Sequence, residues 1–198
     1  MRPSLTVVLV AITFFTQANL PIAQVTPSSK SSPAIGTMER KLQHIQSNAK
    51  VAQPDQTPTE FTEQEINAYF ASGAIKLPAG VQSVIFQGQP EVVTATARVD
   101  FDQLNAGRRS SNPLLSMFSG IHDVVVSAHV RGAGGQGYVN VDTVSLDGVE
   151  IPRFVLQMFV DKYLQPKYPG VGLESKFALP DRIDTAKVGL HKVTITQK

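Results

Sequence analysis

Cysteine and tryptophan are both absent from the 198 residues of this chain. Without cysteine there is no disulfide, no thiolate nucleophile and no thiolate ligand for a metal. Charged residues are sparse and nearly balanced, with 18 basic against 16 acidic side chains. A net charge of +2 is far from the basic stripe that nucleic-acid binding requires, so we expect no nucleic-acid partner. The 42% of hydrophobic residues is enough for a folded core.

The N-terminal segment has the pattern of an export signal. A positive charge near its start is followed by an uncharged apolar run over 5–15, and Thr16 and Ala18 are small residues suited to a cleavage site. The run is about half the ~20 apolar residues that a membrane-spanning helix needs, which disfavours the alternative of an uncleaved anchor. We therefore expect a signal peptide over 1–18 (or 1–23) and an exported protein, periplasmic or secreted, that is soluble after cleavage.

Two composition changes predict the domain organisation. Residues 24–36 are rich in Ser and Pro, which is typical of a flexible leader. Met38, Leu42 and Ile45 then recur at helical spacing, which predicts a short amphipathic helix before a proline-containing linker. We expect the leader with its helix to cover 24–60 and a single domain to cover 61–198.

A capping box gives the sharpest local signal in the sequence. Thr62 can cap a helix whose third residue, Glu65, reaches back to the N–H of the cap, and Phe61 and Ile66 can close a hydrophobic staple. Gly73 then supplies a stop. This pattern predicts a helix over about 63–72.

Beyond residue 80 the hydrophobic period changes from helical to two, which indicates strands. The clearest alternation runs over 91–101, and a hairpin is predicted from 124–131 and 138–146. A change of phase within the second hairpin strand predicts a bulge near Asp142 and Thr143. Further short strands are expected at 84–86, 173–179, 183–188 and 192–196, and a short helix at 114–119.

The longest predicted helix runs from about Pro152 to Leu164 and is apolar around most of its circumference. Such a helix is buried on most sides or lies against something apolar that is not protein. Because most consecutive strands are joined by turns, their pairing should be antiparallel. The residues therefore predict an α+β fold with helices on one face of a twisted sheet.

Catalytic and metal-binding patterns are weak. Gly132, Gly134 and Gly137 spell G-x-G-x-x-G, but a strand follows them, so we interpret them as a hairpin turn and not as a dinucleotide site. His122 and Asp123 are adjacent on a strand and point to opposite faces, so they do not form a catalytic pair. The histidines and carboxylates show no metal-ligand spacing. We expect a non-enzymatic protein with no cofactor and no metal.

Two features are compatible with an apolar ligand, although a filled core is the usual arrangement in protein interiors. Ala95, Ala97 and Ala128 put small side chains where larger ones usually fill a core, which leaves either a packed contact or a slot for a ligand. Arg108 and Arg109 precede an apolar run and could hold a phosphate head group, although an exposed loop before a helix that packs into the core is the more common arrangement for such residues.

Three segments resemble motifs of exported bacterial lipid-binding proteins. The run FTEQEINAYF over 61–70 is similar to their opening T-E-x-E-L-N-A-Y-L. The run VSLDGVEIP over 144–152 is similar to their x-L-x-G-V-x-I-P, and FALP over 177–180 to their late F-x-L-P. Over about residues 37–198 the chain thus resembles the LmeA-like phospholipid-binding group, whose members look like half-sized tubular lipid-binding (TULIP/SMP) domains.

The resemblance implies a curved antiparallel sheet wrapped around a long apolar helix, with shorter helices at the N-terminal side and an apolar groove between sheet and helix. The resemblance implies no catalytic residue. The segment over 108–119 has no counterpart in the group, so the head-group assignment rests on chemistry alone.

Our first hypothesis is an exported binder of phospholipid, of another acyl chain or of another apolar small molecule, with some contact to a membrane surface. The alternative is an envelope structural or interaction protein with a filled core and no ligand. An enzyme is the third hypothesis, and it needs a cleft where His122 or His129 meets Asp100 or Asp142. The expected groove residues are Ala95, Ala97, Val126, Ala128, Phe154, Met158 and Phe159, and the expected head-group residues are Arg108 and Arg109.

Overall fold

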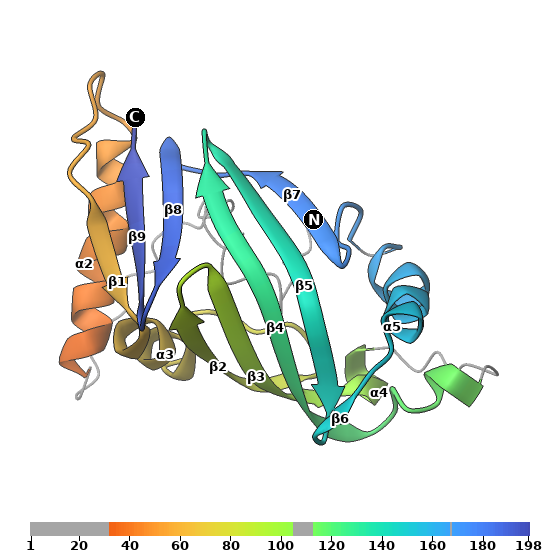
Figure 1. Cartoon of the computed structure of the whole chain (residues 1–198). Helices are drawn as coiled ribbons and strands as arrows, with labels where there is room; N and C mark the ends of the chain where they lie inside the picture. Colours follow the sequence, from red (N-terminus) through yellow and green to blue (C-terminus); the bar gives the residue numbers. More distant parts are fainter. Residues whose placement is uncertain (1–31, 105–112, 167) are drawn as a thin grey trace.

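One antiparallel sheet forms the body of the computed structural model, which describes residues 32–104, 113–166 and 168–198 (Figure 1). The expected signal peptide, Arg108 and Arg109 lie outside the described residues. The strands are β1 (Thr59–Thr62), β2 (Val81–Gln89), β3 (Val92–Asp100), β4 (Ile121–Ala133), β5 (Gln136–Leu146), β6 (Val149–Glu150), β7 (Glu174–Ala178), β8 (Ile183–Gly189) and β9 (Lys192–Gln197). The helices are α2 (Pro33–Asn48), α3 (Glu63–Ala71), α4 (Phe101–Leu104) and α5 (Arg153–Phe159), with a 3₁₀ turn at Pro113–Leu115 and a π-helical turn at Val160–Leu164.

The order of the strands is β1-β9-β8-β4-β3-β2, with β5 on the other side of β4 and β7 beyond β5. Every strand pair within the described residues is antiparallel, as the sequence predicts. The thirteen-residue strand β4 is long enough to pair with β3 over its first part and with β8 at Arg131 and Gly132. The predicted α+β class is therefore confirmed.

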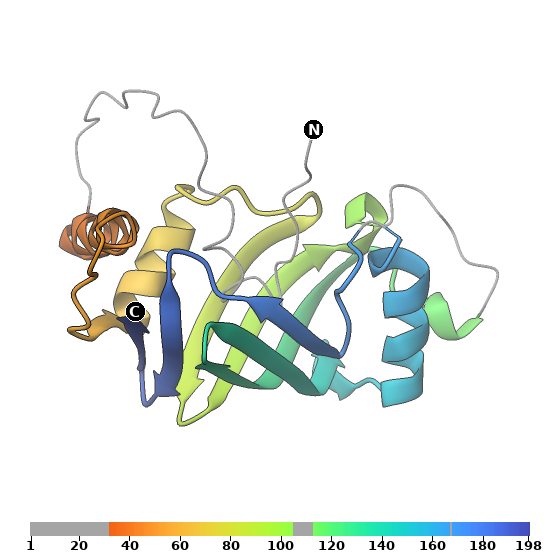
Figure 2. The same cartoon turned by 90° about the horizontal axis from the view of Figure 1, so that it is seen from above.

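The expected long helix inside a wrapped sheet is wrong. The helical segment divides into seven α-helical residues, Arg153–Phe159, and five π-helical residues, Val160–Leu164. It lies beside β5 and β6 at one end of the sheet, which is not strongly curled around it (Figures 1 and 2). Pro152 and Pro166 bracket the segment, and because proline cannot donate a backbone hydrogen bond the helix cannot extend across the sheet.

The capping box at the start of α3 is confirmed. The Thr62 hydroxyl accepts a hydrogen bond from the Glu65 N–H at 3.2 Å, and the Glu65 carboxylate accepts one from the Thr62 N–H at 2.8 Å. The same carboxylate is buried and receives both hydrogen bonds of the Lys41 ammonium, at 2.7 and 2.8 Å. Glu65 thus joins the start of α3 to the middle of α2.

Helix α2 packs against the strands at one edge of the sheet. Its buried Met38 and Ile45 form an apolar cluster with Phe61, Ile183 and Ile195 of β1, β8 and β9. At its C-terminal end the buried amide of Asn48 donates to the side-chain oxygen of Gln197 at 2.8 Å, and Gln197 donates to the carbonyl of Ile45 at 2.9 Å. Apolar packing and buried hydrogen bonds therefore hold α2 to β9.

The short helix expected over 114–119 is a 3₁₀ turn at Pro113–Leu115. The Ser116 hydroxyl donates to the Pro113 carbonyl at 2.6 Å, and the Ser119 hydroxyl donates to the Ser116 carbonyl at 2.7 Å. Serine hydroxyls that bond to nearby carbonyls compete with helical hydrogen bonding. The turn buries Leu115 and exposes Leu114.

Candidate functional site

The structure brings four of the predicted groove residues together on one face of the sheet. Ala95 and Ala97 of β3 alternate with outward-facing polar residues, and Val126 and Ala128 lie on the neighbouring strand β4, with Ala95 directly opposite Val126. All four side chains are buried in the main apolar cluster. We call this surface of β2 to β5 the inner face.

The inner face is flanked by helices at two ends. Helices α2 and α3 lie toward one end and α5 toward the other, and among the described residues no helix crosses the middle, where β3 and β4 run (Figures 1 and 2). The sequence correctly placed these side chains on one surface, but it predicted a helix above them that lies beside them.

The three predicted residues of the helical segment have different environments. Phe159 is buried, and Met158 is partly buried against the main apolar cluster. Phe154 is 60% exposed. Only Phe159 and Met158 are therefore placed to meet something bound on the inner face.

Phe159 belongs to an aromatic cluster that sequence reasoning missed. Its ring centroid is 4.2 Å from that of Phe118, 5.7 Å from Phe101 and 5.2 Å from Tyr163. These rings come from α4, the segment after the 3₁₀ turn, α5 and the π-helical turn. The alternating apolar pattern that ends at Phe101 was the one available signal, but the partners of that ring depend on tertiary packing.

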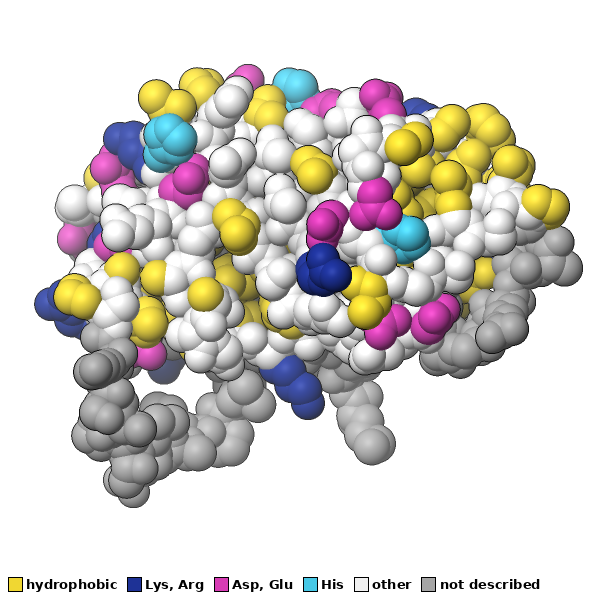
Figure 3. Space-filling view, turned by 90° about the horizontal axis from the view of Figure 1, so that it is seen from below, with side chains coloured by type: hydrophobic (Ala, Val, Ile, Leu, Met, Phe, Trp, Pro, Cys, Tyr) yellow, Lys and Arg dark blue, Asp and Glu magenta, His cyan; other side chains and the backbone are white. Residues whose placement is uncertain are grey.

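Exposed apolar side chains surround the same end of the molecule. Figure 3 shows hydrophobic side chains gathered over the end that carries α5. The large exposed side chains of this region, which we call the apolar end, are Leu114, Met117, Ile121, Val149 and Phe154. Single exposed hydrophobic residues are common, whereas a group of them marks an interaction surface.

His122 lies beside the apolar end and is held from two sides. Its Nδ1 is 2.6 Å from the Asp147 carboxylate and its Nε2 is 2.7 Å from the Ser119 carbonyl. The bond to Asp147 raises the pKa of His122, helped by the Ser119 carbonyl and opposed by partial burial. The bond from His122 and the one from the Asp123 N–H lower the pKa of Asp147. As expected, His122 does not pair with Asp123.

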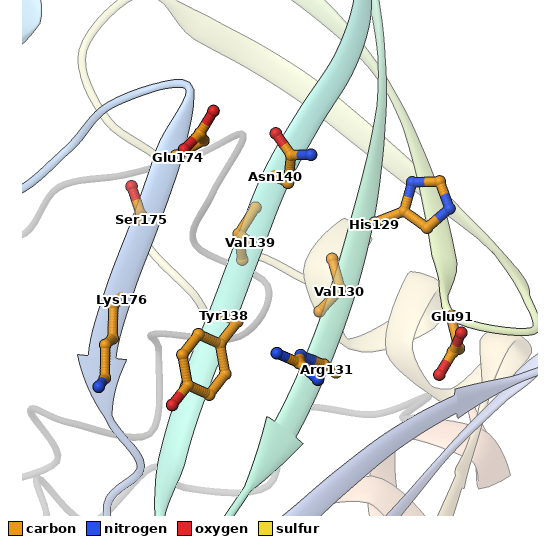
Figure 4. Close-up of a pocket in the computed structure, with 10 residues that line it drawn as sticks. All are labelled: Glu91, His129, Val130, Arg131, Tyr138, Val139, Asn140, Glu174, Ser175 and Lys176. Carbon is orange, nitrogen blue, oxygen red and sulfur yellow. The ribbon is translucent and has the colours of Figure 1, made fainter.

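A hollow of about 650 Å³ lies on the opposite, outer face of the sheet (Figure 4). Sequence alternation predicted that its polar side chains face outward, but not that separate strands would bring them together. It is lined by Glu91, His129, Val130, Arg131, Tyr138, Val139, Asn140, Glu174, Ser175 and Lys176.

His129 in this hollow lies within bonding distance of Asp142, with Nδ1 and Oδ2 2.7 Å apart. This is one of the contacts that the enzyme hypothesis needs. Within residues 32–104, 113–166 and 168–198, the other ring nitrogen of His129 has no hydroxyl partner, and no group of three or more His, Asp or Glu is arranged to hold a metal. The pair therefore has an orienting carboxylate but no nucleophile in contact.

No helix in the described residues combines the length and the apolarity needed to cross a membrane. Comparisons of the chain with protein-family models, with curated proteins and with solved structures found no match.

Proposed function

We propose that this chain is an exported, non-enzymatic protein that binds an apolar ligand, a phospholipid or another acyl chain, against the inner face of the sheet. One observation carries the proposal. Ala95, Ala97 and Ala128 lie in the middle of an apolar face whose described helices lie at its ends. These side chains are already buried, so a ligand would take the place of the groups that now exclude water from them, and small side chains leave the most room for it.

The physical gain would come from the acyl chain itself. Each methylene removed from water contributes about 0.8 kcal/mol, so a chain that buries several methylenes along β3 and β4 binds without any catalytic group. Met158 and Phe159 close the α5 end of the inner face, where they would meet the end of such a chain. The resemblance to the LmeA-like phospholipid-binding group supports the same ligand class.

The apolar end gives this protein a surface for contact with a membrane. Phe154, Val149 and Leu114 are exposed on short turns and at element ends, and isolated apolar tips of this kind can enter the interfacial region of a bilayer. We propose that the ligand enters or leaves here. Arg108 and Arg109 belong to the segment that connects α4 to the 3₁₀ turn at this end, and they stay our proposal for the head-group contact.

Native mass spectrometry of the gently purified chain tests the proposal, together with uptake of a fluorescent fatty acid. We expect co-purified lipid and saturable uptake. Ala97→Leu adds bulk to the inner face and should lower uptake, whereas Thr96→Leu adds the same side chain to the outer face and should not. Circular dichroism and urea unfolding would establish that both variants fold.

Absence of lipid and of uptake in the folded wild-type chain would overturn the proposal and favour the alternative, an interaction protein with a filled core. Equal loss of uptake in both variants would also count against the inner face as the site.

One observation favours a second candidate, acid–base chemistry in the outer hollow. A carboxylate that holds Nδ1 of a histidine, as Asp142 does for His129, is the usual way to orient a catalytic imidazole. Turnover of a nitrophenyl ester that is lost in both His129→Ala and Asp142→Asn would establish this candidate, and its absence would leave the binder as the function.

A further inference from the structure

Four residues from four strands lie side by side on the outer face of the sheet. Lys176 of β7 is opposite Tyr138 of β5, Tyr138 is opposite Arg131 of β4, and Arg131 is opposite Lys187 of β8. Neighbouring strands are about 4.8 Å apart, so the three cations share a strip about 15 Å long. We call these four residues the cation row.

Tyr138 holds two of the cations in place. The guanidinium carbon of Arg131 is 4.9 Å from the centroid of the Tyr138 ring, and the Lys176 ammonium nitrogen is 5.3 Å from it. Both distances allow a cation–π attraction. Figure 4 shows Lys176, Tyr138 and Arg131 on three adjacent strands along one side of the hollow. The ring is therefore a positioning residue that keeps two positive groups near each other.

The described residues supply no ion-pair partner for these three cations. Three carboxylates on neighbouring strands are engaged elsewhere, whereas Glu91 lines the same hollow and has no ion-pair partner among the described residues. Asp142 pairs with His129 at 2.7 Å, Glu174 with Arg153 at 3.1 Å and Asp184 with Lys198 at 2.6 Å. The positive charge of the cation row is therefore not balanced by ion pairs within the described residues.

The arrangement of Arg131 and Lys187 is unfavourable by itself. Two like charges directly opposite each other on neighbouring strands destabilise a sheet. The Tyr138 ring offsets part of this cost for Arg131, but not for Lys187. An arrangement that opposes local stability is expected where function requires it. A bound anion would supply the missing negative charge.

We propose that the cation row binds a phosphate group. Arg131 can present its planar fork to two phosphate oxygens, and a lysine on either side adds a point charge. The hollow of about 650 Å³ and the exposed amide of Asn140 leave room for the rest of a phosphate ester. Glu91 lies across the hollow from Lys176 (Figure 4), and its negative charge disfavours an anion at that edge of the hollow.

This site is independent of the proposed acyl-chain site, because the row and the inner-face alanines lie on opposite faces of the sheet. The phosphate can belong to a small soluble ester or to a lipid head group at a membrane surface, and the experiment separates these sources.

Calorimetric titration of the full chain with inorganic phosphate and with glycerol phosphate, at constant ionic strength, measures binding of a soluble phosphate ester. Flotation with vesicles of phosphatidylglycerol and of phosphatidylcholine measures binding to a lipid head group at a membrane surface. We expect saturable binding in at least one of these two experiments. Arg131→Gln or Lys187→Gln should raise Kd about tenfold or more, since each removes a charge-assisted contact.

Arg98→Gln is the matched control, because Arg98 is exposed on the same outer face but pairs with Asp123 at 3.1 Å. It should bind as the wild type does. A second readout is thermal stability: Lys187→Gln relieves the like-charge pair, so it should raise Tm without phosphate and reduce the rise in Tm that phosphate gives the wild type. No saturable phosphate binding together with no preference for phosphatidylglycerol would overturn the proposal, as would an equal loss in Arg98→Gln.

Discussion

The His122 imidazole lies between the Asp147 carboxylate and the Ser119 carbonyl, 2.6 and 2.7 Å from them. Both ring nitrogens face acceptors, an arrangement that only the doubly protonated ring satisfies. Asp147 also accepts the Asp123 N–H at 2.9 Å. One charged ring therefore joins the start of β4 to the turn between β5 and β6 and to the segment that carries Phe118.

This contact predicts a pH-dependent stability. The pKa of His122 is raised above its ordinary 6.5, so its contribution is complete below pH 6.5 and is lost as the pH rises through the folded-state pKa. The pKa of Asp147 is lowered below its ordinary 3.8, so its contribution is present above pH 3.8 and is lost as the pH falls through the folded-state pKa. The contact should stabilise most between these two values.

Urea unfolding at pH 5.5 and pH 9 checks this expectation. His122→Asn should lower the free energy of unfolding more at pH 5.5 than at pH 9. His44→Asn removes an imidazole from the exposed side of α2 and is the control. An equal loss at both pH values for His122→Asn would show that the ring acts by packing alone.

Gly137→Ala should destabilise the β5–β7 pair. The two strands place Gly137 opposite Phe177, and a Cβ at Gly137 would overlap the Phe177 ring. Overpacking of this kind costs about 1–3 kcal/mol in the free energy of unfolding. Phe177→Leu added to Gly137→Ala should restore part of the loss. Gly36→Ala is the comparison, since nothing lies within 4 Å of a Cβ there and alanine within a helix should gain about 0.5–1 kcal/mol.

Thr62→Ala should remove the N-cap of α3. The hydroxyl that accepts the Glu65 N–H is lost, and such a change costs about 0.5–2 kcal/mol in the free energy of unfolding. Chemical denaturation measures it. Thr96→Ala, on the exposed outer face of β3, should change stability by less than about 0.5 kcal/mol. Equal effects of the two substitutions would mean that the cap is not stabilising.

Phe154→Ser should weaken binding to lipid vesicles without loss of stability. The side chain is 60% exposed at the apolar end, and transfer of one aromatic side chain out of water is worth about tenfold or more in partitioning. Ile85→Ser is the matched control, because Ile85 is 56% exposed on β2, away from α5. Vesicle flotation that responds equally to both substitutions would contradict the assignment of the apolar end.

Local signals in the sequence predicted much of the fold. The capping box placed α3 within a residue of its observed end, because its hydrogen bonds involve neighbours in the chain. The phase change near Asp142 predicted a bulge, and the observed register pairs Ser127 with Thr143 but Ala128 with Val141, so Asp142 is the extra residue. Alternation likewise placed Ala95 and Ala128 on one face.

The position of α5 and the cation row could not be predicted in this way. A nearly all-round apolar helix indicates burial but not which neighbour provides it, and Phe154 is in fact exposed. The cation row joins Lys176, Arg131 and Lys187 through the β5–β7 and β4–β8 pairs. Those registers follow from long-range packing, which no local pattern records.

Strand β4 pairs with three other strands, β3, β5 and β8, and so connects the rest of the sheet. Units that open separately in a folded protein exchange their amide hydrogens at separate rates. The β8–β9 and β2–β3 hairpins can each open while β4 stays paired on its other side. Amide exchange should therefore slow progressively from both edges toward β4, and the last protons to exchange should belong to its central residues.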